Sequence, residues 1–297
     1  MKRVLTAVVL IPLVLIALFR APNWLFATLL ALVAMLALHE YLSLAAGYAY
    51  ETFRSLSFLL MLTFYGIVVW GTWIPSPDGV SVLMAFVFFF ALAPFIYLCA
   101  GMPRKDMRSV LPGAAISYIA LPYIGFSLAC LLFMRIMIGG WFFVLFTFCA
   151  VWVGDTAAYY VGRSFGRIKF APAISPKKTW EGALASVAGS VLAGFLLVQF
   201  APQISRGLTN IHLLTAPEFF SNTSFGMTAL AAVLVNIAGQ LGDLLESLIK
   251  RGAGVKDSGS LLPGHGGILD RIDALLFAAP IALLIFGAFR ENFVRMP

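Results

Sequence analysis

A series of long apolar runs, separated by short charged or proline- and glycine-rich breaks, constrains this chain more than any other feature. The runs cover roughly residues 4–19, 24–44, 55–73, 80–101, 110–134, 139–162, 180–200, 224–249 and 267–289. A helix that crosses the ~30 Å hydrocarbon layer of a bilayer needs roughly 20 residues, which is the length of most of these runs. Backbone polar groups in lipid must be bonded internally, and strand-like alternation is absent, so the runs predict helices. The predicted fold class is all-α, a polytopic integral membrane protein with about nine transmembrane helices.

The composition and charge distribution agree with a membrane partner. The chain is 61% hydrophobic and only 11% charged, whereas about a quarter of the residues of a soluble domain are charged. A net charge of +7 could indicate nucleic acid, but the basic residues lie in short segments between the apolar runs. Membrane topology and anionic lipid both favour that placement, so we expect membrane lipid and no nucleic acid as a partner.

The basic residues also predict an orientation. The first run follows Lys2 and Arg3 like a signal peptide, but Arg20 and Pro22 follow it without a small-residue cleavage site, so we expect a retained span. With the N-terminus inside, fifteen of the 20 lysine and arginine residues fall in cytoplasmic segments. This bias predicts a cytoplasmic N-terminus and active site and an outside C-terminus, with the protein expected in the bacterial inner membrane.

The distribution of charge along the chain predicts a division of labour within one domain. No long linker or convincing repeat is present, so residues 1–297 are predicted to form a single membrane domain. Helices within residues 1–135 carry few ionisable groups and are expected to act as scaffold or dimer surface. His39 and Glu40, near the end of the second run, are expected at the membrane interface. Residues 139–297 are expected to carry the active site.

A polar stripe marks the run 224–249. Its members follow one another at spacings of four, three, four and three, and at ~100° per residue they share one helix face. They are Asn236, Gln240, Asp243, Ser247 and Lys250, with Glu246 beside them. Ionisable groups in a span usually face a protein interior or a water-filled cavity, so the stripe predicts a functional site. A polar seam that joins helices is the alternative.

The segment 250–273 is the densest in charge and is rich in glycine, which lets a backbone approach a ligand closely. Asp270 and Asp273, three residues apart, are expected to share one helix face, and Lys250, Arg251 and Lys256 supply positive charge. Carboxylates in a basic pocket favour a hard divalent cation such as Mg²⁺. The alternative is a loop of simple ion pairs. His265 is a weaker candidate for substrate contact.

A second cluster spans the connection between the runs 139–162 and 180–200. Asp155 lies late in the first of these runs, and Lys177 and Lys178 come directly before the second. Cations at the start of a helix are well placed to meet phosphate, although topology alone would also favour them there.

The stretch from Ser247 to Asp273 resembles the signature of the phosphatidate cytidylyltransferases, also called CDP-diacylglycerol synthases. The residues that carry the resemblance are Ser247, Lys250-Arg251, Lys256-Asp257 and the continuous run from Pro263 to Asp273. Segments 154–156 and 176–182 resemble other stretches of that family.

This resemblance implies a reaction and its requirements. CTP and phosphatidic acid would give CDP-diacylglycerol and pyrophosphate, with Mg²⁺ and K⁺ as a possible second cation, in a homodimer. The implied metal ligands are Asp243, Asp270 and Asp273. Because phosphatidate supplies its own phosphate nucleophile, cations and metal ions would perform the chemistry.

The predicted site therefore has two sets of residues. The catalytic candidates are Asp243, Asp270, Asp273, Lys256 and Arg271. The substrate-binding candidates are Lys177, Lys178, Ser247, Lys250, Arg251, Asp257, His265, Gly266 and Gly267. Whether Asp155 and Glu246 bind a metal directly or support its ligands is open.

Four competing functions remain: a transporter, a CDP-alcohol phosphotransferase, a non-catalytic lipid scaffold and a CTP-using lipid kinase. The charges at span ends weigh against the transporter, and the absence of a D-x₂-D-G-x₂-A-R motif weighs against the phosphotransferase.

Overall fold

The described part of the chain is a set of helices without an extended strand. The computed structural model describes residues 12–48, 50–73, 80–214, 223–261 and 266–294. The main α-helices are α2 (Asn23–Ala45), α3 (Arg54–Trp73), α4 (Val80–Gly101), α5 (Val110–Ala120), α6 (Ser127–Arg135), α7 (Gly140–Phe165), α8 (Trp180–Asn210), α9 (Phe225–Gly252) and α10 (Leu269–Phe289). A π-helical segment, Leu121–Phe126, joins α5 to α6, and residues 12–20 are also helical.

Among the described residues, eight helical segments are long and apolar enough to cross a membrane. They correspond to the predicted runs from 24–44 onward, so the prediction of an all-α polytopic membrane protein is confirmed. Half of the predicted first span, residues 4–11 of 4–19, lies outside the described residues.

Dense contacts divide the chain into two compact units, each built from separate segments. The first unit contains Ala21–Ala129 together with Leu248–Ile272, and the second contains Cys130–Ser247 together with Asp273–Pro297 and the segment Ala7–Arg20. The glycine-rich segment near the C-terminus therefore packs with the N-terminal helices. The organisation as a single membrane domain stays a prediction.

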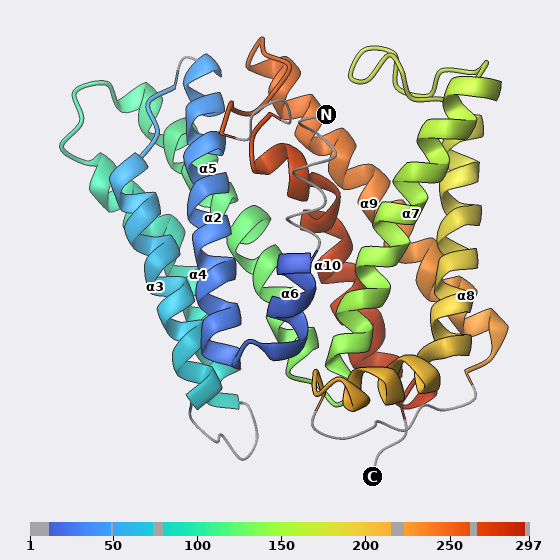
Figure 1. Cartoon of the computed structure of the whole chain (residues 1–297). Helices are drawn as coiled ribbons and strands as arrows, with labels where there is room; N and C mark the ends of the chain where they lie inside the picture. Colours follow the sequence, from blue (N-terminus) through green and yellow to red (C-terminus); the bar gives the residue numbers. More distant parts are fainter. Residues whose placement is uncertain (1–11, 49, 74–79, 215–222, 262–265, 295–297) are drawn as a thin grey trace. The chain divides into compact units, whose positions relative to one another are not determined.

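In the first unit, α2 packs along α3, and α4 along α5 (Figure 1). Phe64, which is 1% exposed, is surrounded by aromatic rings that include Tyr65 and Phe89. The buried Tyr97 hydroxyl donates a hydrogen bond to the Ser57 hydroxyl at 2.9 Å, which satisfies it inside the unit.

The end of α2 also meets the end of α9 within this unit. The Tyr48 hydroxyl donates to the Ile249 carbonyl at 2.8 Å. A Cβ on Gly47 would lie 2.8 Å from the Ala253 carbonyl oxygen. This close approach brings the segment that follows α9 next to the end of α2.

In the second unit, α7 and α8 lie side by side (Figure 1). Small residues allow this approach, because a Cβ on Gly189 would lie 2.9 Å from the Ala157 methyl group. Such residues are typical of helix contacts in membranes. An aromatic core holds α7 against α10, where Phe143 and Phe286 stack with ring centroids 4.6 Å apart.

The α7–α8 connection is fixed at its end by a short backbone pairing. Lys169 and Thr179 form an isolated antiparallel bridge, and the Trp180 N–H donates to the Ile168 carbonyl at 2.9 Å. Thr179 then caps α8 by accepting a hydrogen bond from the Gly182 N–H at 3.2 Å. Lys178 is therefore held immediately before the first turn of α8.

Candidate functional site

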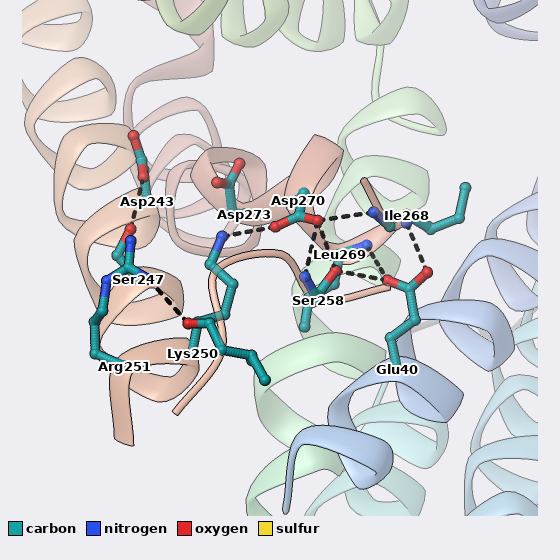
Figure 2. A network of polar contacts seen from close by, with 12 residues as sticks. Glu40, Asp243, Ser247, Lys250, Arg251, Ser258, Ile268, Leu269, Asp270 and Asp273 are labelled. Atoms are coloured by element: carbon teal, nitrogen blue, oxygen red, sulfur yellow. Dashed lines mark hydrogen bonds and ion pairs between the residues drawn. The ribbon is translucent and has the colours of Figure 1, made fainter. Parts of the chain in front are cut away.

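In the first unit, Asp270 is the centre of a buried polar cluster at the start of α10 (Figure 2). Its Oδ2 accepts hydrogen bonds from the Ser258 N–H at 3.0 Å, the Ser258 hydroxyl at 3.0 Å and the Gly267 N–H at 2.7 Å. Its Oδ1 accepts one from the Lys250 ammonium at 2.6 Å. The Lys250 and Asp270 side chains are only 10% and 7% exposed. In a pair this deeply buried, removing one charge leaves the other without compensation, so the two residues depend on each other.

Glu40 joins this cluster from α2. Its carboxylate accepts hydrogen bonds from the Ser258 hydroxyl at 2.9 Å and from the Ile268 and Leu269 N–H groups at 2.9 and 2.8 Å. Glu40 is 5% exposed, so its side chain packs inside the protein, and its predicted depth at the membrane interface stays a prediction. The signal that could have found it is the carboxylate within an apolar run, which usually faces a protein interior.

Gly266 and Gly267 allow the backbone before α10 to pass close to the Glu40 and Asp270 carboxylates. Gly266 has φ +79°, a left-handed conformation that other residues rarely adopt. A Cβ on Gly267 would overlap Glu40 Oε2 and the Ser258 hydroxyl. Both were predicted to touch substrate; in the structure they shape the loop around Glu40 and Asp270.

The remaining predicted residues of this segment lie at its surface. Arg251, Lys256, Asp257 and Arg271 are all exposed. Arg251 donates to the Val255 carbonyl at 2.9 Å, which shapes the turn after α9. His265 lies outside the described residues. The segment therefore presents cations around a buried lysine–aspartate pair.

The second unit holds its own charged cluster, made by α7, α9 and the segment before α8. The Lys178 ammonium lies 2.8 Å from Asp243 Oδ2, and both side chains are partly exposed, at 25% and 35%. The Ser247 hydroxyl donates to Asp243 Oδ1 at 3.4 Å (Figure 2). Asp155 lies close enough to Asp243 and Lys178 to interact electrostatically with both. Lys177, which precedes Lys178 in the chain, is exposed.

The polar stripe of α9 serves two purposes along its length. Asn236 donates to the Ser186 and Ser190 hydroxyls at 2.9 and 2.7 Å and accepts from Gln240 at 2.7 Å. This part of the stripe is a seam that joins α8 to α9, the alternative left open by the sequence. Asp243 lies further along the same helix, in the charged cluster. Glu246 is fully buried, with 0% exposure.

Asp273 lies at a close approach of α9 and α10 within the second unit. A Cβ on Gly242 would lie 2.6 Å from the Asp273 carbonyl oxygen, so the two backbones nearly touch. Asp273 Oδ1 accepts a hydrogen bond from the Ala274 N–H at 2.8 Å. Because Gly242 has no side chain, the turn of α9 that carries Asp243 can lie against the turn of α10 that carries Asp273.

The donor chemistry of the second unit fits a hard cation. Asp155, Asp243 and Ser247 supply carboxylate and hydroxyl oxygens, the ligands that Mg²⁺ prefers, and Asp243 already holds one cationic group. Asp270 fits less well, because three donors bind its Oδ2 and only Oδ1, bonded to Lys250, could exchange its partner. Within the described ranges, no group of three or more His, Cys, Asp or Glu side chains is placed to hold a metal. The predicted ligand set of three aspartates stays a prediction.

The fold and these clusters define a class: an α-helical polytopic membrane protein in which each of the two compact units contains a lysine–aspartate pair. Comparison with known proteins places it further. The model of the cytidylyltransferase family matches residues 1–289, and the chain belongs to this family.

Similar proteins carry a more specific name. The chain is 41% identical over 141 residues to the phosphatidate cytidylyltransferase of Haemophilus influenzae, covering 48% of this chain and 44% of that protein. It is 39% identical over 202 residues to the Brucella suis protein of that name, covering 67% and 66%. The Staphylococcus haemolyticus protein is 35% identical over 187 residues, covering 63% and 64%. The chain matches less than two thirds of the length of each relative.

Proposed function

We propose that this protein is a phosphatidate cytidylyltransferase, which transfers CMP from CTP to phosphatidic acid and releases CDP-diacylglycerol and pyrophosphate. The observation that carries the proposal is the pair of lysine–aspartate contacts, Lys178 with Asp243 and Lys250 with Asp270. Lys178, Lys250 and Asp270 fall in segments that resemble this family, and Asp243 is one of the metal ligands that the resemblance implies. Family membership and the names of the relatives support the same activity.

The reaction requires no nucleophilic side chain. A phosphate oxygen of phosphatidic acid forms a bond to the α-phosphorus of CTP, and the bond from that phosphorus to the bridging oxygen of pyrophosphate breaks. The protein must bring two polyanions together and offset the charge that develops on the transferred and leaving groups. Fixed cations do this electrostatically, and catalysis of this kind rests on positioning.

Two kinds of cation are available for this task. Lys178 and Lys250 are held by carboxylates, so their positions are fixed before substrate binds. Arg251, Lys256 and Arg271 are exposed, so phosphates of CTP or of the lipid headgroup would reach them from solvent. Lys177, Ser247, Asp257, His265, Gly266 and Gly267 complete the proposed substrate contacts.

Asp243 and Asp273 would hold Mg²⁺, with Asp270 Oδ1 as a further ligand and K⁺ as a second cation. Mg²⁺, when bound, would supply neutralising charge to the α-phosphoryl group and the leaving pyrophosphate. The chain's own part is to orient the carboxylates, and Lys178 and Lys250 hold Asp243 and Asp270 in place. Asp155 would add negative charge beside Asp243.

We further propose the bacterial inner membrane as the location, with the N-terminus and site in the cytoplasm and the C-terminus outside. The protein would act as a homodimer. The basic bias of the predicted cytoplasmic segments supports this orientation. Phosphatidic acid would then reach the site laterally from the inner leaflet.

The test uses detergent-purified protein, phosphatidic acid, Mg²⁺ and CTP labelled in either the α- or the γ-phosphate. We expect the α-label in a lipid that migrates as CDP-diacylglycerol, the γ-label in pyrophosphate, and no transfer with EDTA. A γ-labelled lipid would instead establish a lipid kinase. Folded protein that labels no lipid, across several acyl chains, would contradict the proposal.

A further inference from the structure

We propose that Glu40, on α2, is a positioning residue of the transfer site. Its carboxylate holds the first turn of α10 and the Ser258 hydroxyl, and through them it orients Asp270 and Lys250. This inference rests on the proposed function. It gives a helix from the N-terminal part of the chain, predicted to be scaffold, a direct role in the geometry of the site.

The first step is the start of α10, which lacks a cap of its own. The residue before Leu269 is Ile268, whose side chain cannot accept a hydrogen bond, whereas Ser, Thr, Asp and Asn are the usual caps. The N–H groups at a helix start have no partner within the helix. Here the Ile268 N–H donates to Glu40 Oε1 at 2.9 Å and the Leu269 N–H to Glu40 Oε2 at 2.8 Å. Glu40 therefore supplies the cap from 228 residues away in the chain.

The second step is the Ser258 hydroxyl, which connects two carboxylates. Its oxygen lies 2.9 Å from Glu40 Oε2 and 3.0 Å from Asp270 Oδ2. A hydroxyl carries one proton, so it is shared between them or donated to one at a time. Asp270 in turn binds Lys250 at 2.6 Å. The contacts thus run from α2 through the loop to α10 and α9, as Figure 2 shows.

The third step is that the site requires a carboxylate and tolerates little else. Each Glu40 oxygen faces a backbone N–H donor, so the amide nitrogen of glutamine would face one of those donors in either orientation. Space is also closed, since a Cβ on Gly259 would lie 2.8 Å from Glu40 Oε1. The negative charge beside the helix start is further favoured by the helix dipole.

The experiment compares Glu40→Gln with Glu51→Gln in the purified full-length chain. Glu51 is an exposed carboxylate in the same unit and serves as the matched control for loss of charge. We expect Glu40→Gln to lower kcat for CMP transfer about 10- to 100-fold, because small displacements at a reacting centre have effects of this size. The KM for CTP should change less than about threefold if Glu40 touches no substrate. Glu51→Gln should match wild type, and Glu40→Asp should restore part of the rate.

A double-mutant cycle tests the path through Ser258. Ser258→Ala should lower kcat about 3- to 10-fold, since it removes one hydrogen bond and leaves the Ser258 N–H on Asp270. The double variant Glu40→Gln/Ser258→Ala should lose less activity than the product of the two single losses, because part of the effect of Glu40 passes through the Ser258 hydroxyl. Losses that multiply would overturn the path, and a wild-type kcat for Glu40→Gln would overturn the role of Glu40.

Amide hydrogen exchange gives a readout that does not depend on activity. The Ile268 and Leu269 amides should exchange at least about tenfold faster in Glu40→Gln than in wild type, with little change in α3. Unchanged exchange would sink the proposed cap. If Glu40→Gln does not fold, Ser258→Ala and Glu40→Asp carry the same comparison. Wild-type protein without CMP transfer would contradict the proposed function, whereas the exchange result would still decide whether Glu40 holds α10.

Discussion

At the scale of single residues, the two lysine–aspartate pairs share their chemistry but differ in burial. Lys250 and Asp270 are 10% and 7% exposed, whereas Lys178 and Asp243 are 25% and 35% exposed. Removing one partner of a buried pair leaves an uncompensated charge, while water screens an exposed pair. The same substitution should therefore affect stability at one position and mainly activity at the other.

We expect Lys250→Met to lower the free energy of unfolding by about 3–5 kcal/mol, because it leaves the buried Asp270 carboxylate without its positive partner. Lys178→Met should lower it by no more than about 1 kcal/mol. Both variants should lose CMP transfer if the lysines meet phosphate. Thermal unfolding in detergent, with transfer activity measured on the same samples, separates the two effects. Equal destabilisation by both variants would contradict the difference in burial.

Residue patterns in the sequence found Asp270, Lys250 and Asp243, because an ionisable group in an apolar run or a glycine-rich segment stands out locally. They could not find the role of Glu40. Its partners lie 218 to 229 residues away, and spacing along one helix reports only on neighbours a turn or two apart. The same limit left Asn236 ambiguous until its contacts with Ser186 and Ser190 placed it in a seam.

At the scale of elements, glycines decide how closely helices approach. Gly242 and Gly226 both lie in α9, but only the first meets a neighbouring backbone. A Cβ on Gly242 would lie 2.6 Å from the Asp273 carbonyl oxygen, and a Cβ on Gly226 would meet nothing within 4 Å. Comparing the same substitution at these two positions separates the effect of helix propensity from the effect of helix packing.

Gly226→Ala should leave stability unchanged or raise it by up to about 1 kcal/mol, because alanine favours the helix. Gly242→Ala should lower the unfolding temperature and reduce transfer activity, because α10 must move away from α9 beside Asp273. Unfolding in detergent and initial rates of CMP transfer measure both. A stabilised, fully active Gly242→Ala variant would show that the close approach is unimportant.

Helix boundaries were largely predictable because the length of a membrane span is set by the bilayer, so apolar runs mark them directly. The path between helices was less so. The π-helical segment Leu121–Phe126 interrupts the predicted run 110–134 and has a proline in its first turn. Proline also lies inside α4 and α10, which stay α-helical, so it does not by itself mark the interruption.

At the scale of the whole molecule, the order of segments in the chain differs from their grouping in space. Leu248–Ile272 belongs to the unit of the N-terminal helices, although in the sequence it lies more than 100 residues after them. Patterning reports which residues face lipid or protein, and carries little information on which distant segment they face.

The proposed orientation can be tested on the whole molecule in intact cells. Lys169→Cys, in the α7–α8 connection, and Arg206→Cys, near the end of α8, both replace exposed residues. An impermeant maleimide should label Arg206→Cys in intact cells and Lys169→Cys only after the membrane is opened. The parent chain, with its three native cysteines, gives the background. The reverse pattern would invert the proposed topology.

The bond between Glu40 and the start of α10 has a consequence for the order of assembly. Ser258 is synthesised 218 residues after Glu40, which at roughly 5–20 residues per second is about 10–45 s later. Throughout that interval α2 carries a carboxylate whose partners do not yet exist. The cluster around Asp270 therefore forms only after the start of α10 has been translated. A nascent chain would place α2 in the bilayer well before this contact could form, so the Glu40 contact would report that translation has passed the first turn of α10.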